Sequence, residues 1–329
     1  MGERFVELQS WLHDELKLSS FSIVPASSDA SFRRYFRVTG NGQSRIVMDA
    51  PPDKEDCGPF IAIAGAMADL GLNVPRVLHA DTRRGFLLLS DLGSRHYLQS
   101  LSERSADGLY GDALRALRLL QAAPVKGAGL PDYDRALLLR EMALFRDWYL
   151  ARHLRMDMSE AVGEVLEQTF SFLAEEALAQ PRVWVHRDYH SRNLMVTEAN
   201  NPGILDFQDA VIGPATYDVV SLLRDCYVSW PRQLVMQWLR DYLAAAQAEG
   251  GLPGVATDQF VRWFDLMGAQ RHLKAIGIFA RLNYRDVKPG YLSDIPRTLA
   301  YVVEVSALYP ELRPLHLLLT QLVLPHLPK

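Results

Sequence analysis

The amino-acid sequence predicts an α+β protein of two lobes, with a small antiparallel β-sheet lobe in residues 1–90 and a larger, mainly helical lobe in residues 91–329. Short apolar segments separated by polar turns occupy the first part, a pattern typical of hairpin-connected strands. Long segments with apolar residues at helical spacing follow from about residue 106 onward. The chain has 329 residues, of which 49% are hydrophobic and 22% charged, so each lobe can bury a sizeable core.

The small lobe is expected to begin with an amphipathic helix, because apolar residues such as Leu8 and Leu12 recur at helical spacing. The Thr-Gly-Asn-Gly turn at 39–42 predicts a hairpin between the second and third strands. A helix over 56–70 should end at Gly71, a typical left-handed cap. The strands expected in this lobe cover residues 21–25, 32–38, 45–50, 76–79 and 86–89.

The large lobe is predicted from amphipathic periodicity and from three short apolar pieces. The expected helices cover residues 106–122, 134–152, 158–179, 232–248, 256–282 and 311–326. The short apolar pieces at 183–185, 194–196 and 204–205 resemble buried strands that flank a loop.

Composition excludes several classes of protein. A net charge of −4 and a pI of about 6.1 argue against a broad nucleic-acid surface. Cys57 and Cys226 are too few for a disulfide framework and are read as free thiols in a reducing cytosol. The charged N-terminus lacks the apolar core of a signal peptide, and the apolar tract Leu315–Leu324 is too short to span a bilayer. We therefore expect a cytoplasmic monomer with neither a membrane nor a nucleic-acid partner.

The most informative segment, Val183–Val196, is an apolar strand that enters a polar loop and returns to an apolar strand. Within the loop, Asp188 precedes Asn193 by five positions, and a second acid, Asp206, follows another apolar pair. Phosphoryl transfer uses one carboxylate to orient the attacking hydroxyl and accept its proton. It uses a second carboxylate and an amide oxygen to hold magnesium ions that bridge the ATP phosphates. His-Arg-Asp-x-x-x-x-Asn followed by Asp-Phe-x is that combination, here with Gln208 in the last position.

These motifs carry a specific resemblance. His186–Asn193, Asp206–Asp209 and Gly213–Asp218 together resemble the aminoglycoside phosphotransferase and choline kinase family, and the similarity extends over nearly the whole chain. Ser27–Arg37 and Val47–Pro52 resemble a branch of that family, the bacterial sugar kinases of cell-wall recycling. Those enzymes phosphorylate N-acetylmuramate and N-acetylglucosamine at the anomeric hydroxyl.

The resemblance implies a bilobal protein-kinase-like fold and an ATP- and Mg²⁺-dependent sugar kinase. Asp188 would be the catalytic carboxylate, with Asn193 and Asp206 as the magnesium ligands. His186 would brace the loop by hydrogen bonding, and Asp218 would brace it from a helix start. The implied nucleotide contacts come from the phosphate-covering turn and the hinge, at Ser28, Ser31, Phe32, Arg34, Leu89, Asp91 and Leu92.

The sequence departs from the kinase pattern at two places. The phosphate-covering turn carries serines and arginines where glycines are usual. The third strand has Met48 and Asp49 at the positions where a kinase places a lysine that pairs with the ATP phosphates and a helix glutamate. Either Lys54, Arg33 or Arg34 supplies that charge, or the enzyme acts without it.

The acceptor is expected to be a small-molecule sugar bound against the C-terminal helices. Arg271, Lys274 and Ile278 are spaced to lie broadly on one helix face, and a cation there could pair with a carboxylate such as a lactyl group. The candidate substrate contacts are His190, Arg192, Asp209, Arg271, His272 and Lys274.

Other interpretations remain open at this point. His186-x-Asp188-x-His190 could form a transition-metal site if the segment were a strand. The acceptor could instead be an aminoglycoside, choline or homoserine. The missing lysine also permits a nucleotide-binding regulatory pseudokinase. Against a protein kinase, Gly213–Asp218 follows Asp206 too closely to leave an activation loop.

Overall fold

The computed structural model describes residues 2–18, 20–28 and 32–326 and divides the chain into two compact units. The first unit contains Met1–His96 and Leu194–Asp209, and the second contains Tyr97–Asn193 and Ala210–Lys329. The chain therefore returns to the first unit for one short segment in the middle of the second.

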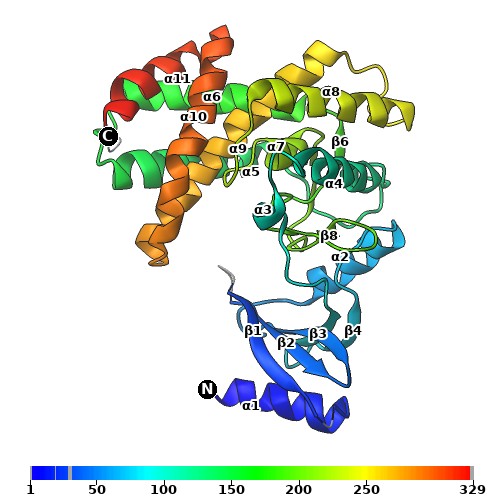
Figure 1. The fold of residues 1–329 in the computed structure, drawn as a ribbon. Helices are drawn as coiled ribbons and strands as arrows, with labels where there is room; N and C mark the ends of the chain where they lie inside the picture. Colours follow the sequence, from blue (N-terminus) through cyan, green and yellow to red (C-terminus); the bar gives the residue numbers. More distant parts are fainter. Residues whose placement is uncertain (1, 19, 29–31, 327–329) are drawn as a thin grey trace. The chain divides into compact units, whose positions relative to one another are not determined.

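The first unit is built on a five-stranded antiparallel sheet in the order β1-β2-β3-β5-β4, as expected from the alternation of strands and turns (Figure 1). Asn41 and Gly42 both have positive φ, 52° and 73°, in the two-residue turn between β2 and β3. This confirms the predicted hairpin, because such turns need left-handed residues to match the strand twist. The strands are β1 (Ser22–Ser28), β2 (Arg34–Gly40), β3 (Gln43–Asp49), β4 (Val77–Asp81) and β5 (Phe86–Ser90).

Helices and a short two-stranded ribbon complete the first unit. α1 (Glu3–Ser10) lies beside the sheet in Figure 1 and continues into a π-helical turn, η1 (Trp11–Glu15). Leu8 of α1 packs with Val47 and Phe86 of the sheet in one buried cluster. α2 (Gly58–Asp69) ends as predicted, with Gly71 at a φ of 83°. The returning segment forms a two-stranded ribbon, β7 (Leu194–Met195) with β8 (Gly203–Ile204).

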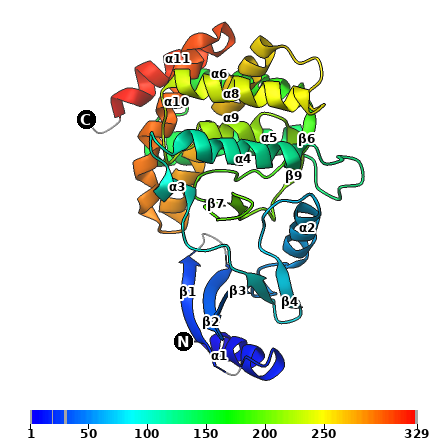
Figure 2. The same cartoon turned by 45° about the vertical axis from the view of Figure 1, so that its right-hand side comes forward.

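The second unit is mainly helical, and α9 (Thr257–Arg285) is its central helix. α9 packs against both α5 and α8, which lie on either side of it in Figure 2. Every residue from 264 to 274 is buried, as in a helix surrounded by protein on all sides. The other helices are α3 (Tyr97–Ser100), α4 (Ala106–Gln121), α5 (Arg135–Leu144), α6 (Glu160–Leu178), α7 (Tyr217–Leu223), α8 (Arg232–Ala248), α10 (Ile295–Leu308) and α11 (Arg313–Leu318).

Short segments complete this unit. β6 (Arg182–Val185) pairs antiparallel with β9 (Val211–Pro214), a partner that the sequence analysis did not predict. The remaining segments are the π-helical η2 (Phe145–His153) and η5 (Leu319–Val323) and the 3₁₀ segments η3 (Pro289–Asp294), η4 (Pro310–Leu312) and η6 (Leu324–His326).

The expected helix over 134–152 changes character midway. α5 ends at Leu144, and the chain continues as the π-helical segment η2. Gly277 of α9 approaches the backbone at this junction: a Cβ built there would lie 2.3 Å from the Leu144 carbonyl carbon and 2.5 Å from the Phe145 nitrogen. The absence of a side chain at Gly277 therefore permits the close contact between α9 and the α5–η2 helix.

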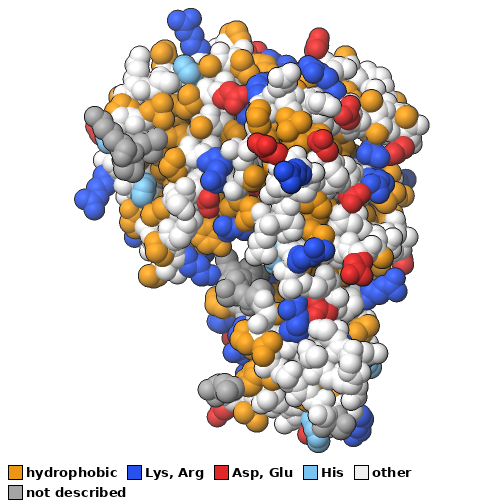
Figure 3. All heavy atoms as spheres, viewed as in Figure 1, with side chains coloured by type: hydrophobic (Ala, Val, Ile, Leu, Met, Phe, Trp, Pro, Cys, Tyr) orange, Lys and Arg blue, Asp and Glu red, His pale blue; other side chains and the backbone are white. Residues whose placement is uncertain are grey.

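Surface chemistry agrees with the composition. Lys and Arg side chains alternate with Asp and Glu side chains on the face shown in Figure 3. Among the residues that the structure describes, no helix has the length and apolar character needed to cross a membrane. Cys57 and Cys226 are both buried free thiols.

Gly277→Ala should destabilise the protein by about 1–3 kcal/mol, because the new methyl group would overlap backbone atoms that cannot rotate away. Thermal or urea unfolding of the full chain measures the effect. Gly111→Ala is the matched control, since a Cβ there meets nothing within 4 Å in the middle of α4. We expect the control to gain about 0.5–1 kcal/mol from helix propensity. Equal effects at both positions would contradict the assigned close contact.

Candidate active site

The loop with the sequence motif follows the buried strand β6 in the second unit and runs to Asn193. Asp218, in the first turn of α7, accepts hydrogen bonds from the backbone N–H groups of His186, at 2.6 Å, and Arg187, at 3.0 Å. This confirms the bracing role predicted for Asp218. Burial raises the pKa of this carboxyl to about 7, while the two backbone donors act in the opposite direction.

The loop is also held by bonds within itself. The backbone N–H of Asp188 donates to Nδ1 of His186 at 3.2 Å, so His186 acts as the predicted brace. The carbonyl of Asp188 accepts the N–H of His190 at 3.0 Å and the side-chain amide of Asn193 at 3.1 Å. Since a carbonyl can only accept, the Asn193 nitrogen is directed at it, and the amide oxygen is the atom that Asn193 would offer a metal ion.

Positive charge surrounds the Asp188 carboxylate. Burial alone would raise its pKa, but Lys274, His190, Arg187 and Arg271 act together to keep that pKa below its usual value. The carboxylate therefore remains ionised at neutral pH, as a group that orients a hydroxyl and accepts its proton must be.

A buried carboxylate that sequence analysis missed organises these cations. Glu141 of α5 accepts a hydrogen bond from the Arg187 guanidinium at 2.6 Å and pairs with the Lys274 ammonium at 3.0 Å. The Tyr133 hydroxyl donates to its other oxygen, and Lys274 also donates to the Tyr217 hydroxyl at 2.9 Å. Despite burial, these cations hold the Glu141 pKa below its usual value. No linear motif marks Glu141, which lies 46 positions from Arg187.

The candidate acceptor contacts on α9 lie in two different environments. Arg271 and Lys274 face the catalytic loop electrostatically, and Arg271 also contacts the Cys226 sulfur at 3.8 Å. His272 stacks on Tyr301 and bonds through Nε2 to the Arg224 carbonyl at 2.8 Å, which makes Nε2 the protonated nitrogen. Burial lowers the pKa of His272 to about 3, so it is a neutral packing group in this arrangement.

The end of the loop carries an aromatic cluster. The Arg192 guanidinium lies 3.6 Å from the centroid of the Tyr227 ring and 5.4 Å from that of Tyr291, and it pairs with Asp294 at 3.9 Å. His190 meets Tyr227 edge-on at 5.3 Å, and burial lowers its pKa. The structure thus brings together two of the residues predicted to contact the acceptor, His190 and Arg192, around the Tyr227 ring.

The predicted nucleotide contacts lie in the first unit. Asp91 accepts hydrogen bonds from the Arg37 guanidinium at 2.7 and 3.1 Å and from the Ser44 hydroxyl, which ties the segment after β5 to β2 and β3. Leu89 is buried in β5, whereas Phe32 is exposed. The other positions are Leu92, whose side chain lies beside Gly203; Arg34, paired with Asp49; Ser28, at the end of β1; and Ser31, which lies outside the described residues.

The second acidic motif also belongs to the first unit. Asp206 has a φ of 64° and accepts a hydrogen bond from the Gln208 amide at 2.7 Å. The Arg33 guanidinium interacts electrostatically with both Asp206 and the exposed Asp209. In the described part of the chain, no three His, Cys, Asp or Glu side chains gather as a metal cluster. The expected donor set differs from such a cluster, because it combines carboxylate and amide oxygens, the ligands that magnesium prefers.

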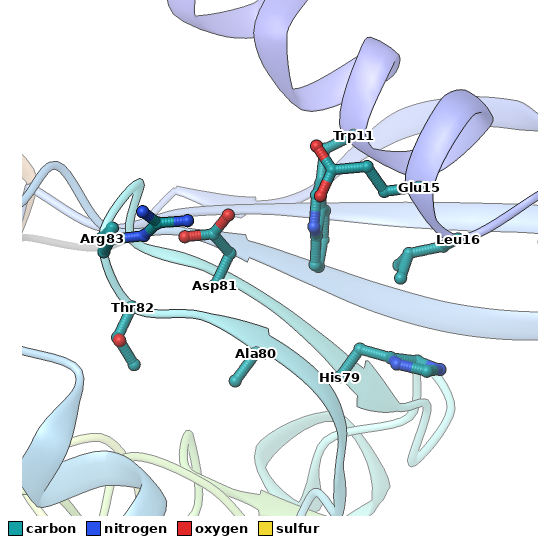
Figure 4. Close-up of a pocket in the computed structure, with 8 residues that line it drawn as sticks. All are labelled: Trp11, Glu15, Leu16, His79, Ala80, Asp81, Thr82 and Arg83. Atoms are coloured by element: carbon teal, nitrogen blue, oxygen red, sulfur yellow. The ribbon is translucent and has the colours of Figure 1, made fainter.

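A pocket of about 420 Å³ lies elsewhere in the first unit, between the end of the N-terminal helix and the β4–β5 turn (Figure 4). Arg84 donates to two of its acids, Glu15 at 2.6 Å and Asp81 at 2.7 Å. The predicted site residues do not line this pocket, and its acidic groups are neutralised within the fold. The residues that line it are Trp11, Glu15, Leu16, His79, Ala80, Asp81, Thr82 and Arg83.

A five-stranded antiparallel sheet, a mainly helical second unit and this braced acidic loop define a phosphotransferase with a protein-kinase-like fold. Comparison with known proteins agrees. A sequence model described as the phosphotransferase enzyme family matches residues 22–257. The chain belongs to this family.

Several curated relatives match over nearly their full length. Proteins named N-acetylmuramate/N-acetylglucosamine kinase are 47% identical in Pseudomonas putida and 49% identical in Pseudomonas aeruginosa. These matches cover 97% of this chain and 96% and 97% of the two relatives. A protein of the same name from Neisseria meningitidis serogroup B is 44% identical over 98% of this chain and 96% of the relative.

Solved structures share the fold at low identity. The GDP complex of aminoglycoside 2′-phosphotransferase-IIIa is 17% identical with a TM-score of 0.64, covering 92% of this chain and 98% of that chain. A Plasmodium vivax ethanolamine kinase is 13% identical with a TM-score of 0.63, covering 95% and 90%. These similarities establish the kinase-like fold that the sequence predicted.

Asp218→Asn should lower the free energy of unfolding by about 1–3 kcal/mol. An amide can accept only one of the two backbone N–H groups that Asp218 binds, and its own NH₂ would face the other. Chemical denaturation followed by circular dichroism measures the loss. Asp132→Asn is the control, because the exposed pair of Asp132 with Arg182 should contribute little. If both variants unfold at the same denaturant concentration, Asp218 does not brace the loop.

Proposed function

We propose that this protein is an ATP-dependent kinase of N-acetylmuramate and N-acetylglucosamine that phosphorylates the anomeric hydroxyl and acts in the cytoplasm during peptidoglycan recycling. The observation that carries the proposal is the 44–49% identity, over 97–98% of the chain, to relatives bearing that kinase name. The cationic surroundings of Asp188 add physical support. They suit an acceptor with a carboxylate and disfavour a polycation such as an aminoglycoside.

In this proposal Asp188 accepts a hydrogen bond from the anomeric hydroxyl and orients its oxygen toward the terminal phosphate of ATP. Asp188 takes up the hydroxyl proton as the new O–P bond forms and the bond from that phosphorus to the ADP oxygen breaks, which releases ADP. The lowered pKa supports this role, because the carboxylate stays ionised while the substrate binds. Glu141 maintains the arrangement by sharing Lys274 and Arg187, which would otherwise place their full charge on Asp188.

Asn193 and Asp206 would supply the amide and carboxylate oxygens for magnesium. The bond from the Asn193 nitrogen to the Asp188 carbonyl supports this assignment, since it leaves oxygen as the donor atom toward a cation. Magnesium held by these residues would supply positive charge that offsets the negative charge of the phosphate groups.

The acceptor contacts proposed from the sequence differ in accessibility. Arg192 has 40% of its side chain exposed and stacks on Tyr227, so a partly exposed cation lies at the end of the loop that carries Asp188. We assign acceptor recognition first to Arg192 and His190, with Asp209 as a further candidate. Arg271 and Lys274 are buried and act on the reaction through the charge that they place around Asp188.

Asp188→Asn should reduce kcat by a factor of about 10²–10⁴ while ATP affinity stays nearly unchanged, because the amide keeps the shape but cannot accept the proton. The assay is magnesium-dependent ADP release with N-acetylmuramate, N-acetylglucosamine, glucose, choline and kanamycin offered separately. Phosphorus NMR then locates the new phosphate on the product.

Turnover restricted to the two amino sugars, with phosphate at C1, would establish the proposed activity. Turnover with choline or kanamycin would replace the acceptor and retain the reaction class. An Asp188→Asn enzyme within a few-fold of the wild type would show that another group accepts the proton.

Glu141→Gln should lower kcat about tenfold, or about 1.4 kcal/mol in the barrier, and move the acid limb of the pH–rate profile to lower pH. Glutamine keeps the size but removes the anion that Lys274 and Arg187 share. Their charge then depresses the Asp188 pKa further, which makes its carboxylate a weaker proton acceptor. Steady-state kcat at neutral pH measures the first effect. A pH–rate profile extended below pH 3.8, where the lowered Asp188 pKa lies, measures the second.

Glu175→Gln is the control for that experiment, because Glu175 is exposed and pairs only loosely with Arg135 at 3.5 Å. A lower kcat in Glu141→Gln with an unmoved acid limb would mean that Glu141 supports the fold without tuning Asp188.

A further inference from the structure

The third strand lacks the lysine that kinase-like enzymes use to contact the ATP phosphates while pairing with a glutamate at the neighbouring helix. In this chain β3 carries Met48, which is buried, and Asp49. The cations close in sequence that could replace this lysine are Lys54, Arg33 and Arg34. The structure distinguishes them by what each one already binds.

Arg34 and Lys54 are poor replacements, because Arg34 already binds a buried carboxylate and Lys54 is exposed to solvent. Arg34 lies directly opposite Asp49 in the β2–β3 register, and its guanidinium bonds to that carboxylate at 3.0 Å through Nε. Arg4 bonds to the other Asp49 oxygen at 2.7 Å. Asp49 is fully buried, so both arginines are needed to compensate its charge. Lys54 has 53% of its side chain exposed and lies 3.6 Å from the solvent-exposed Asp53.

Arg33 is placed differently. Its guanidinium pairs with Glu55 at 3.0 Å, and their side chains are only 10% and 14% exposed. The other Glu55 oxygen accepts the backbone N–H of Phe32 at 3.3 Å. Glu55 lies just before α2, which begins at Gly58. One carboxylate at a helix start therefore fixes both the backbone and the cation of the turn that leads into β2.

The same guanidinium faces the second acidic motif. Asp206 and Asp209 both act on Arg33 electrostatically, and Phe207 between them packs on Phe60 of α2 at 4.9 Å. Arg33 thus stands among three carboxylates, those of Glu55, Asp206 and Asp209. A lysine–glutamate pair beside a metal-binding aspartate is the kinase arrangement, and Arg33 with Glu55 reproduces it from the turn that leads into β2.

We infer that Arg33, anchored by Glu55, is the cation that binds the phosphate chain of the nucleotide, in place of the missing third-strand lysine. The inference rests on the proposed ATP-dependent kinase activity. A guanidinium has five N–H donors, so it can hold a carboxylate with one edge and phosphate oxygens with the rest. Asp49 on β3 fits this assignment, because it holds Arg34 away from the phosphate-binding role.

The test compares nucleotide affinities of the full chain by isothermal titration in magnesium. Arg33→Gln should weaken ATP binding about 10- to 100-fold, the range for a lost charge-assisted bond, and leave adenosine binding within twofold. Lys54→Gln, which removes the exposed cation next to Glu55 in sequence, should leave both affinities within twofold. Arg33→Lys keeps the charge without the fork and should lose less ATP affinity than Arg33→Gln.

Parallel losses of ATP and adenosine affinity in Arg33→Gln or Arg33→Lys would overturn the inference, because Arg33 would then maintain the shape of the site. Unchanged ATP affinity in Arg33→Gln would overturn it as well. If Arg33→Gln does not fold, the Arg33→Lys comparison decides alone. A wild-type protein that binds no ATP would instead refute the proposed function, so the two failures are distinguishable.

Discussion

The structure around the catalytic loop depends on how buried charge is compensated. Glu141, Arg187 and Lys274 come from α5, the loop and α9, and each would be costly to bury without the others. Their contacts join three segments that are distant in sequence and fix the cations near Asp188. The same ion pairs that hold the helices together therefore determine the protonation state of the proposed catalytic carboxylate.

In the first unit, the need to compensate a buried charge determines which arginine remains available to bind a nucleotide. Asp49 is buried on β3, where its charge must be met, and Arg34 and Arg4 meet it. This arrangement leaves Arg33, one position earlier on the turn, to pair with Glu55 instead. The presence of Asp49 on β3 thus decides which arginines are bound there and which one is left to pair with Glu55. The position of this positive charge follows from ion pairing in the fold and is not given by a sequence motif.

Elements with clear periodicity could be predicted from the sequence, including the β2–β3 hairpin, the Gly71 cap and the long helices. Elements that lack a clear periodicity could not be predicted in this way. All seven residues of α7 are buried, so no polar face marks it as a helix, and β9 is a buried strand of four residues. η2 begins at Phe145, where Gly277 of α9 approaches the backbone, and such a tertiary contact is not visible in the spacing of residues.

The residues of the candidate site also fall into those that the sequence could predict and those that it could not. Asp188, Asn193 and Asp206 stand in a linear motif whose spacing reflects one loop, and a sequence can display it. Glu141 and Glu55 reach their arginines from 46 and 22 positions away, distances at which spacing carries no information. Their identity follows only from the folded arrangement, in which a buried guanidinium requires a carboxylate.

Both motifs contain one residue with a strained backbone. Arg187 and Asp206 both adopt positive φ, 75° and 64°, although neither is glycine. Such a conformation costs on the order of 1–3 kcal/mol and persists only where its surroundings enforce it. Asp218 binds the Arg187 N–H, and Gln208 bonds to the Asp206 carboxylate, so each strained residue is held by a specific polar partner. The polar contacts that compensate buried charge in this protein therefore also hold the backbone of the two acidic motifs.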